Sequence, residues 1–264
     1  MSRQAPVRDF APTVQRLRIR YAKRGRLRFT SHRDFQRALE RAIRRAGVPV
    51  AFSTGFSPHP KISYSNSAPT GAASEAEYVE IGVTVECDPG LVGAALDSAL
   101  PPGLDIVDVV IASSSDFAAR LEASRWRIEL HEADRAQVEA AVATFLAADE
   151  VEVQRLMKSG MRTFDARAAV AEALVLPELD AELDGELDTG AAGAADSNGC
   201  VILELVVRHT TPSVRPDDVL SALRRVADLV PPAPPRVTRL AQGPLDPVSC
   251  KVNDPFGPDR AGVE

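Results

Sequence analysis

Five arginines spaced for one side of a helix have the clearest chemical potential in the sequence. Arg33, Arg37, Arg41 and Arg45 follow at four-residue intervals, and Arg44 lies beside the last of them; we call these five the arginine stripe. Like charges at this spacing cost a helix about 0.2–0.5 kcal/mol per pair. Arginine carries forked donors that match phosphate and carboxylate groups. The stripe is therefore a solvated helix face, a surface that follows RNA phosphates, or a docking face for an acidic protein partner.

A histidine between two prolines is the second candidate. Pro58-His59-Pro60 is followed directly by Lys61. The prolines fix the backbone φ and remove two N–H donors. The segment is either a structural turn or a preset His59/Lys61 pair that binds phosphate or assists proton transfer. We expect His32 to face the same side. His59, Lys61 and His32 are thus candidate catalytic residues, and His59 and Lys61 join the stripe as candidate nucleic-acid contacts.

The charge of the chain is unevenly divided. The 264 residues carry a net charge of −6, yet 13 of the 31 Lys and Arg residues lie in residues 13–63, with only two acids, Asp34 and Glu40. The rest of the chain is therefore strongly acidic. The local field of the basic segment differs from what the net charge suggests, which favours a polyanionic partner.

Several kinds of site and segment are not encoded. The three cysteines, Cys87, Cys200 and Cys250, are far apart, and no CxxC or CxxxCxxC motif occurs. We expect no iron–sulfur cluster, zinc site or other cofactor, and free thiols of this kind fit a reducing cytoplasm. No Walker A or GxGxxG motif is present. No apolar run reaches the roughly 18 residues that span a bilayer, and the N-terminus lacks a secretory apolar region, so we expect a soluble cytoplasmic protein without a membrane partner. His131 and His209 lie at expected strand ends, which favours structural roles.

The elements that must position the candidate residues alternate in type along the first half. Leu17, Ile19 and Tyr21 alternate with arginines, which predicts a half-buried strand over 16–21. Ser31 caps a helix whose apolar residues recur at helical spacing until Gly47 stops it. Further predicted elements are strands over 48–52, 61–65, 78–85 and 104–112 and a helix over 89–99. With residues 53–65 as a hairpin arm, this is the β-α-β-β-α-β order of a ferredoxin-like unit.

The second half repeats this order. Strands are predicted over 125–131, 151–157, 200–207 and 236–241, helices over 133–147 and 216–230, and a strand edge with a short helix over 163–176. Residues 178–198 are mostly Asp, Glu, Gly and Ala, so burial cannot offset their ordering entropy, and we predict a disordered acidic insertion. Whether that insertion folds back on the arginines as a mimic of nucleic acid stays open.

The prediction for the whole chain is an α+β protein of two tandem ferredoxin-like lobes. The basic first lobe spans 13–115 and the second spans 124–242, with the disordered insertion inside it. Residues 1–12 are expected to form a disordered tail. Residues 243–264, which hold four prolines, are expected to form a loose tail in which only 251–256 could dock.

Four segments give the chain a resemblance to a known family. They are Leu27-Arg28-Phe29-Thr30-Ser31-His32-Arg33-Asp34, Arg41-Ala42-Ile43-Arg44-Arg45-Ala46-Gly47, Gly55-Phe56-Ser57-Pro58-His59-Pro60-Lys61-Ile62-Ser63, and Gly71 with Ser74-Glu75 and Glu77-Tyr78. Together they resemble the radical-SAM-linked domain family of unknown function, in its free-standing actinobacterial form. The resemblance is dense over about residues 15–112 and thinner afterwards, around 163–167 and 216–223. It implies an accessory or substrate-presenting module without its own radical SAM domain, associated with RNA-processing or radical SAM enzymes.

Three functions remain open at this point. The first is a non-catalytic RNA-binding or RNA-maturation accessory, whose phosphate contacts dominate because the aromatic motif of RNA-recognition modules is missing. The second is a metal-independent ribonuclease resembling CRISPR repeat-processing endonucleases, with His59 or His32 as base and Lys61 or Arg33 as stabiliser. The glycine-rich C-terminal loop of those enzymes is not evident. The third is a protein-interaction module that docks an acidic partner.

Overall fold

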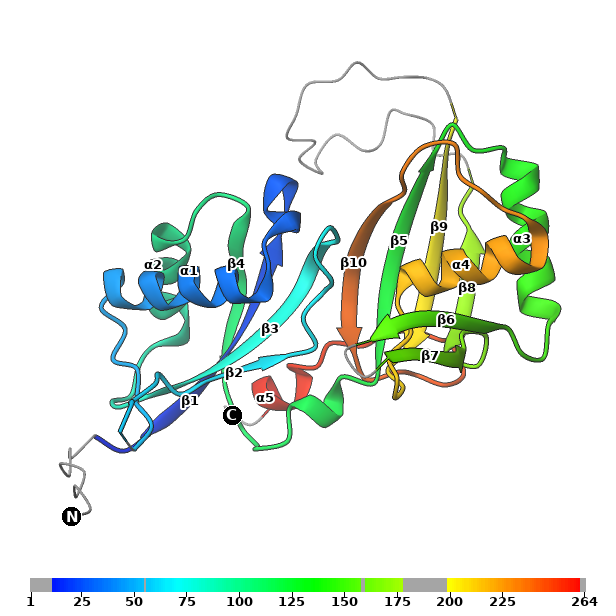
Figure 1. Cartoon of the computed structure of the whole chain (residues 1–264). Coiled ribbons are helices and arrows are strands. Elements are labelled where there is room, and N and C mark those ends of the chain that lie inside the picture. The colour runs from blue at the N-terminus through cyan, green and yellow to red at the C-terminus, as the bar shows by residue number, and fades with distance from the viewer. Residues whose placement is uncertain (1–10, 55, 158–159, 178–198, 262–264) are drawn as a thin grey trace, which may run out of the picture. The chain divides into compact units, whose positions relative to one another are not determined.

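The computed structural model describes residues 11–54, 56–157, 160–177 and 199–261, which form two compact units (Figure 1). The first unit comprises Met1–Ala118 together with Pro255–Glu264, and the second comprises Ala119–Asp254. The last segment of the chain thus belongs to the first unit, although it follows the second unit in sequence. The predicted insertion, residues 178–198, and residues 1–10 of the predicted N-terminal tail lie outside the described residues.

The first unit holds a four-stranded antiparallel sheet and two long helices. Its strands lie in the order β4-β1-β3-β2. The elements of this unit are β1 (Gln15–Lys23), the 3-10 helix η1 (Gly25–Phe29), α1 (His32–Arg45), β2 (Ile62–Ser65), β3 (Ala73–Val83), α2 (Pro89–Ala99), β4 (Leu104–Ile111) and, at the end of the chain, α5 (Gly257–Ala261).

One face of this sheet packs against α1 and α2 (Figure 1). Alternate residues of a strand point to the same face, and Leu17, Ile19 and Tyr21 are buried among apolar side chains of both helices. The rings of Tyr21 and Phe35 stack with centroids 4.1 Å apart. Leu39 is fully buried beside them. The apolar stripe of α1 therefore fixes which side of that helix faces solvent.

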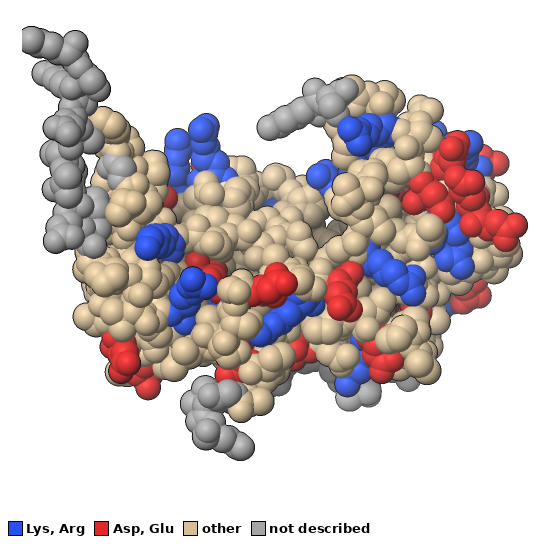
Figure 2. Space-filling view, turned by 90° about the horizontal axis from the view of Figure 1, so that it is seen from below, with Lys and Arg blue, Asp and Glu red and all other residues tan. Residues whose placement is uncertain are grey.

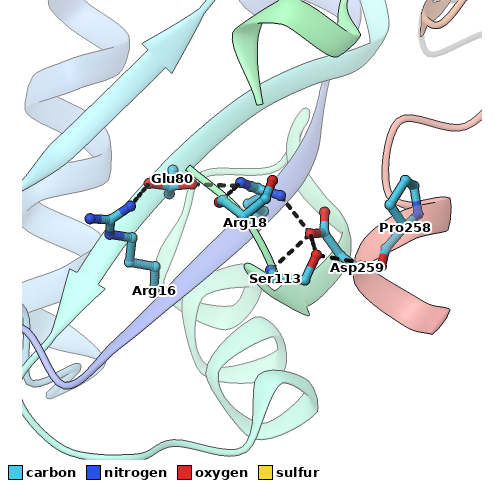
Figure 3. A network of polar contacts seen from close by, with 7 residues as sticks. Arg16, Arg18, Glu80, Ser113, Pro258 and Asp259 are labelled. Carbon is cyan, nitrogen blue, oxygen red and sulfur yellow. Dashed lines mark hydrogen bonds and ion pairs between the residues drawn. The ribbon is translucent and has the colours of Figure 1, made fainter. Parts of the chain in front are cut away.

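The opposite face of the sheet is covered by the end of the chain (Figure 3). Arg18, on β1, is 1% exposed and donates to Asp259 of α5 at 2.5 Å and to Glu80 of β3 at 3.0 Å. The backbone N–H and hydroxyl of Ser113 donate to the same Asp259 oxygen at 2.9 and 2.7 Å. Phe256 is fully buried beside these groups. The C-terminal segment is thus part of the first unit's interior.

The second unit holds a second antiparallel sheet with strands in the order β10-β5-β9-β8, and a separate hairpin of β6 and β7. Its two long helices, α3 and α4, contact each other. Trp126, Ile128 and Leu130 are buried on one face of β5, while Arg125 and Arg127 pair with Glu204 on the other. The elements are η2 (Ala118–Arg120), β5 (Ala123–His131), α3 (Arg135–Ala147), β6 (Glu152–Met157), β7 (Gly160–Asp165), β8 (Val170–Val175), β9 (Cys200–Arg208), α4 (Pro216–Ala227) and β10 (Arg236–Gly243).

The mixed α+β class is confirmed, and several local predictions are wrong. Residues 48–52 form only isolated bridges, Val50 with Val83 and Phe52 with Pro60, because Pro49 lacks an N–H to donate to a ladder. Residues 163–176 contain parts of two strands, β7 and β8, and no helix. The arginine face of β1 is not left to solvent at Arg18, because α5 covers it.

The expectation of a loose C-terminal tail is also wrong for its described part. Leu245 bridges Val252, and Phe256 packs edge-on against Tyr78 with ring centroids 5.3 Å apart. Arg260 pairs with Asp108 of β4. Phe256 and Asp259 are buried, although the four prolines of this segment had favoured a loose tail. Among the described residues, no helix has the length and apolar character needed to cross a membrane.

Candidate nucleic-acid interface

The helix α1 presents the arginine stripe because its other side is committed to the core. The Ser31 side chain caps the helix by accepting from the Asp34 N–H at 3.2 Å. Phe35, Leu39 and Ile43 recur at four-residue spacing and are buried. Side chains offset from that apolar row must face outward. The geometry of the stripe thus follows from the burial of the row behind it.

All five arginines of the stripe are exposed, and their charges are sparsely compensated. Arg37 lies 3.9 Å from Asp34, and both side chains are 63% exposed, so solvent screens this pair strongly. Arg45 donates to the Ala99 carbonyl at 3.3 Å. No described residue pairs with the other three, Arg33, Arg41 and Arg44. The stripe is therefore a run of positive charge in which a single exposed ion pair is formed with a described residue.

Two of the basic residues before the stripe, Arg18 and Arg24, are closely paired with acids. Arg18 is buried against two carboxylates, as described above. Arg24 pairs with Glu75 and Asp105, and the hydrogen bond to Glu75 raises the pKa of Arg24. These acids come from β3, β4 and α5, far along the chain from the basic segment. Distant acids therefore neutralise part of the basic excess of residues 13–63 outside α1.

Figure 2 shows one face of the molecule, on which basic and acidic side chains are interspersed. No single positive field covers this face.

A cluster of polar and aromatic side chains surrounds His32 at the start of α1. The Nδ1 and Nε2 atoms of His32 lie 3.1 Å from the Ser67 hydroxyl and 3.1 Å from the Gln36 amide nitrogen. The His32 and Tyr64 rings meet edge-on with centroids 4.9 Å apart. Burial, followed by the charge of Glu40, raises the pKa of Tyr64, so its hydroxyl keeps its proton. The ring of His32 is thus held in one orientation by three neighbours.

The His59/Lys61 loop lies next to the beginning of β2. The backbone N–H of His59 donates to the Ser53 hydroxyl at 3.0 Å, and the Ser53 N–H donates to the His59 carbonyl at 2.8 Å. Lys61 Nζ donates to the Thr13 hydroxyl at 3.1 Å. The side chains of His59 and Lys61 are both exposed. The backbone contacts account for the turn, and the two side chains remain available for a ligand.

The structure does not bring the candidate catalytic residues into one group. His32 contacts Tyr64 and Ser67 at the end of β2, whereas His59 and Lys61 precede that strand. Across the described ranges, no hydrogen bond joins His32 to His59 or Lys61. A catalytic base and its stabiliser must share one reacting atom. No contact among the described residues bears on the prediction that His32 faces the same side as the His59/Lys61 loop.

Two features at the start of α1 could not be predicted from the sequence alone. Phe29 is 59% exposed, which no pattern in the sequence indicates. Ser67 reaches His32 across 35 positions of sequence, which no local pattern predicts. Within the described parts of the chain, no three His, Cys, Asp or Glu side chains gather as metal ligands would.

Two polar groups of the second unit, His209 and Asp218, have structural partners. His209 lies 2.7 Å from the Ser124 hydroxyl and 2.6 Å from the Leu121 carbonyl, and burial lowers the pKa of His209. Arg155 of β6 pairs with Asp218 of α4. Burial raises the pKa of Asp218. These contacts tie together elements of one unit.

The chain belongs to a bacterial family without an assigned activity. Residues 16–216 match the model of a family described as uncharacterized proteins conserved in bacteria, DUF2344. A search of curated proteins found no match.

Proposed function

We propose that this chain, which belongs to an uncharacterized bacterial family, is a non-catalytic RNA-binding accessory protein. It would hold RNA phosphates on the arginine stripe. One observation carries the proposal: all five arginines of the stripe are exposed, and three of them, Arg33, Arg41 and Arg44, have no ion-pair partner among the described residues. Exposed arginines displace the counterions that surround a polyanion, and the release of those ions drives binding.

The spacing of the stripe suits a regular row of phosphates. Its 14-residue helix is about 21 Å long at 1.5 Å per residue, and the arginines recur about once per turn. Guanidinium groups bind phosphate oxygens in pairs, which favours arginine over lysine at each position. His59 and Lys61 add exposed donors in the same unit. Contacts of this kind position RNA and carry little sequence information.

We also infer that each unit is a variant of the ferredoxin-like fold. What supports this is the strand order: the last, first, third and second main strands lie side by side in both sheets. In the second unit, the hairpin of β6 and β7 is then an addition between α3 and β8.

The working context follows from the resemblance of residues 15–112. The motifs around Phe29–Asp34 and Pro58–Lys61 resemble those of radical-SAM-linked domains, so the proposed role is to present RNA to a separate radical SAM or RNA-processing enzyme. The three cysteines are free, which fits work in the cytoplasm.

The test is a titration of the purified protein with a pool of fluorescent single-stranded and structured RNAs. The test variant is Arg37→Glu/Arg41→Glu, whose side chains point away from the core. The control is Arg224→Glu/Arg225→Glu on α4, which makes the same change in net charge on an exposed helix face of the second unit. Circular dichroism verifies that both variants fold.

We expect the wild type and the α4 control to bind alike and the stripe variant to bind at least tenfold more weakly. Equal binding by all three proteins would reject the stripe as the site. Absence of binding to any RNA would reject the function and favour an acidic protein partner for the stripe. RNA integrity in the same samples tests the ribonuclease hypothesis, because cleavage lost in His59→Ala or His32→Ala would contradict a non-catalytic role.

A further inference from the structure

We propose that the stripe takes single-stranded RNA and that an unpaired base stacks on Phe29 at the start of α1. This inference rests on the proposed function and narrows its substrate. It joins three observations: an exposed aromatic ring, a loop that fixes that ring, and arginines that begin beside it.

Phe29 is a large apolar side chain left 59% exposed at the end of η1. The Arg28 guanidinium lies 4.8 Å from the centroid of its ring. That placement puts a cation on the ring, as in the cation–π pairs that accompany base stacking in RNA-binding proteins. Phe29 nevertheless stays 59% exposed, so part of its surface is open to a ligand.

The loop before β3 holds this pair in place. The Gly71 N–H donates to the Arg28 carbonyl at 2.8 Å. Gly71 has a φ of +97°, and a Cβ at this position would lie 4.0 Å from the Phe29 ring. A glycine is favoured there because other residues rarely adopt this backbone conformation. The backbone beside Phe29 is therefore held by this loop, which limits the positions that the ring can take.

The ring of His32, three residues after Phe29 in the chain, is a second aromatic ring held by its contacts. Ser67 and Gln36 contact its two nitrogens, and the residue is exposed. The stripe begins at the next residue, Arg33. Aromatic rings followed directly by phosphate-binding arginines match the needs of a single strand, in which base and phosphate are both accessible.

The same arrangement disfavours a duplex. Bases inside an RNA helix stack on one another, and only unpaired bases can turn outward onto a protein ring. Stacking does not depend strongly on base identity, because every base has an aromatic face. We therefore expect a preference for unpaired RNA with little preference for sequence.

The experiment compares a short unstructured RNA carrying one 2-aminopurine with a duplex of the same sequence. The proteins are the wild type, Phe29→Ala and Phe29→Trp. The control is Met161→Ala, which removes an apolar side chain of similar exposure, 62%, from β7 in the second unit. Affinity and 2-aminopurine fluorescence are both recorded.

We expect Phe29→Ala to bind the single strand about tenfold more weakly, which is the size of one base–aromatic stack. Phe29→Trp and Met161→Ala should keep the wild-type affinity. The quenching of 2-aminopurine on binding should be lost only in Phe29→Ala. The duplex should bind more weakly than the single strand.

Two results would overturn the inference alone: equal affinity for strand and duplex, or a Phe29→Ala variant that binds as the wild type while Arg37→Glu/Arg41→Glu does not. Failure of the wild type to bind either RNA would overturn the proposed function as well. In that case, a protein ligand that binds the wild type and not Phe29→Ala would identify the ring as a protein contact.

Discussion

Arg18 shows how a single residue changes its meaning between sequence and structure. On the alternating pattern of residues 16–21, it lies on the polar face of a strand. In the fold it is 1% exposed, and two carboxylates and the Ser114 carbonyl surround its guanidinium. The partner Asp259 lies 241 positions away in sequence, and no local pattern connects the two.

The first prediction concerns this buried pair. Asp259→Asn removes the charge that Arg18 faces and leaves a buried guanidinium with Glu80 as its remaining counter-charge. Loss of one partner of a buried pair costs about 3–5 kcal/mol, and we expect about 3 kcal/mol because Glu80 stays. Denaturant unfolding measures the change. Asp108→Asn is the matched control, because it breaks the partly exposed pair with Arg260 and should cost less than about 1 kcal/mol. Equal effects would show that the buried pair is not specially stabilising.

The second prediction concerns pH and His209. Burial lowers the pKa of His209 in the folded protein, whereas in the unfolded chain the imidazole protonates near its ordinary value of 6.5. The unfolded state therefore binds more protons below about pH 6.5, and stability falls as the pH drops from there toward the folded pKa. The slope from one group is at most about 1.4 kcal/mol per pH unit.

Unfolding midpoints at about pH 7.5 and 5.5 test this pH dependence. His209→Gln should reduce the difference between the two midpoints. An unchanged difference in His209→Gln would assign the slope to other groups.

At the scale of elements, α1 could be predicted almost completely. Ser31, the apolar row and Gly47 mark its start, buried face and end, and the structure has a helix over His32–Arg45. The central strands were also predictable, since alternation is a local property. The segment 163–176 was not, because β7 and β8 are short and their pairing partners lie in β6 and β9. The position of Ser67 beside His32 likewise depends on tertiary contacts.

The third prediction separates stability from binding on α1. Arg41→Glu places an acid four residues from both Arg37 and Arg45, so two repulsive pairs become attractive. We expect the variant to be more stable by about 0.5–1 kcal/mol and to bind RNA more weakly. Thermal unfolding and the RNA titration measure the two effects on one sample. Arg41→Gln should give a smaller change in the same direction. A destabilised Arg41→Glu would show that the stripe supports the fold.

At the scale of the whole molecule, the division of charge was visible in the sequence and its compensation was not. Thirteen basic residues lie in residues 13–63, but Arg18 and Arg24 are paired with acids from later strands and from α5. The return of the C-terminus to the first unit has the same origin, since it depends on Phe256 and Asp259 meeting groups that only the folded sheet assembles. The candidate contacts could thus be predicted by residue type, and their separation from the structural arginines could not.

The most direct test of the account is the salt dependence of RNA binding by the wild type and by Arg37→Glu/Arg41→Glu. Between about 50 and 200 mM salt, the logarithm of the binding constant for a single strand falls with a slope of about −0.7 for each phosphate contacted. We predict a steep slope for the wild type, shallower by about 1.4 or more in the variant, since at least two phosphate contacts are lost. An affinity that does not change with salt, or the same slope in both proteins, would contradict a phosphate-binding role for the stripe.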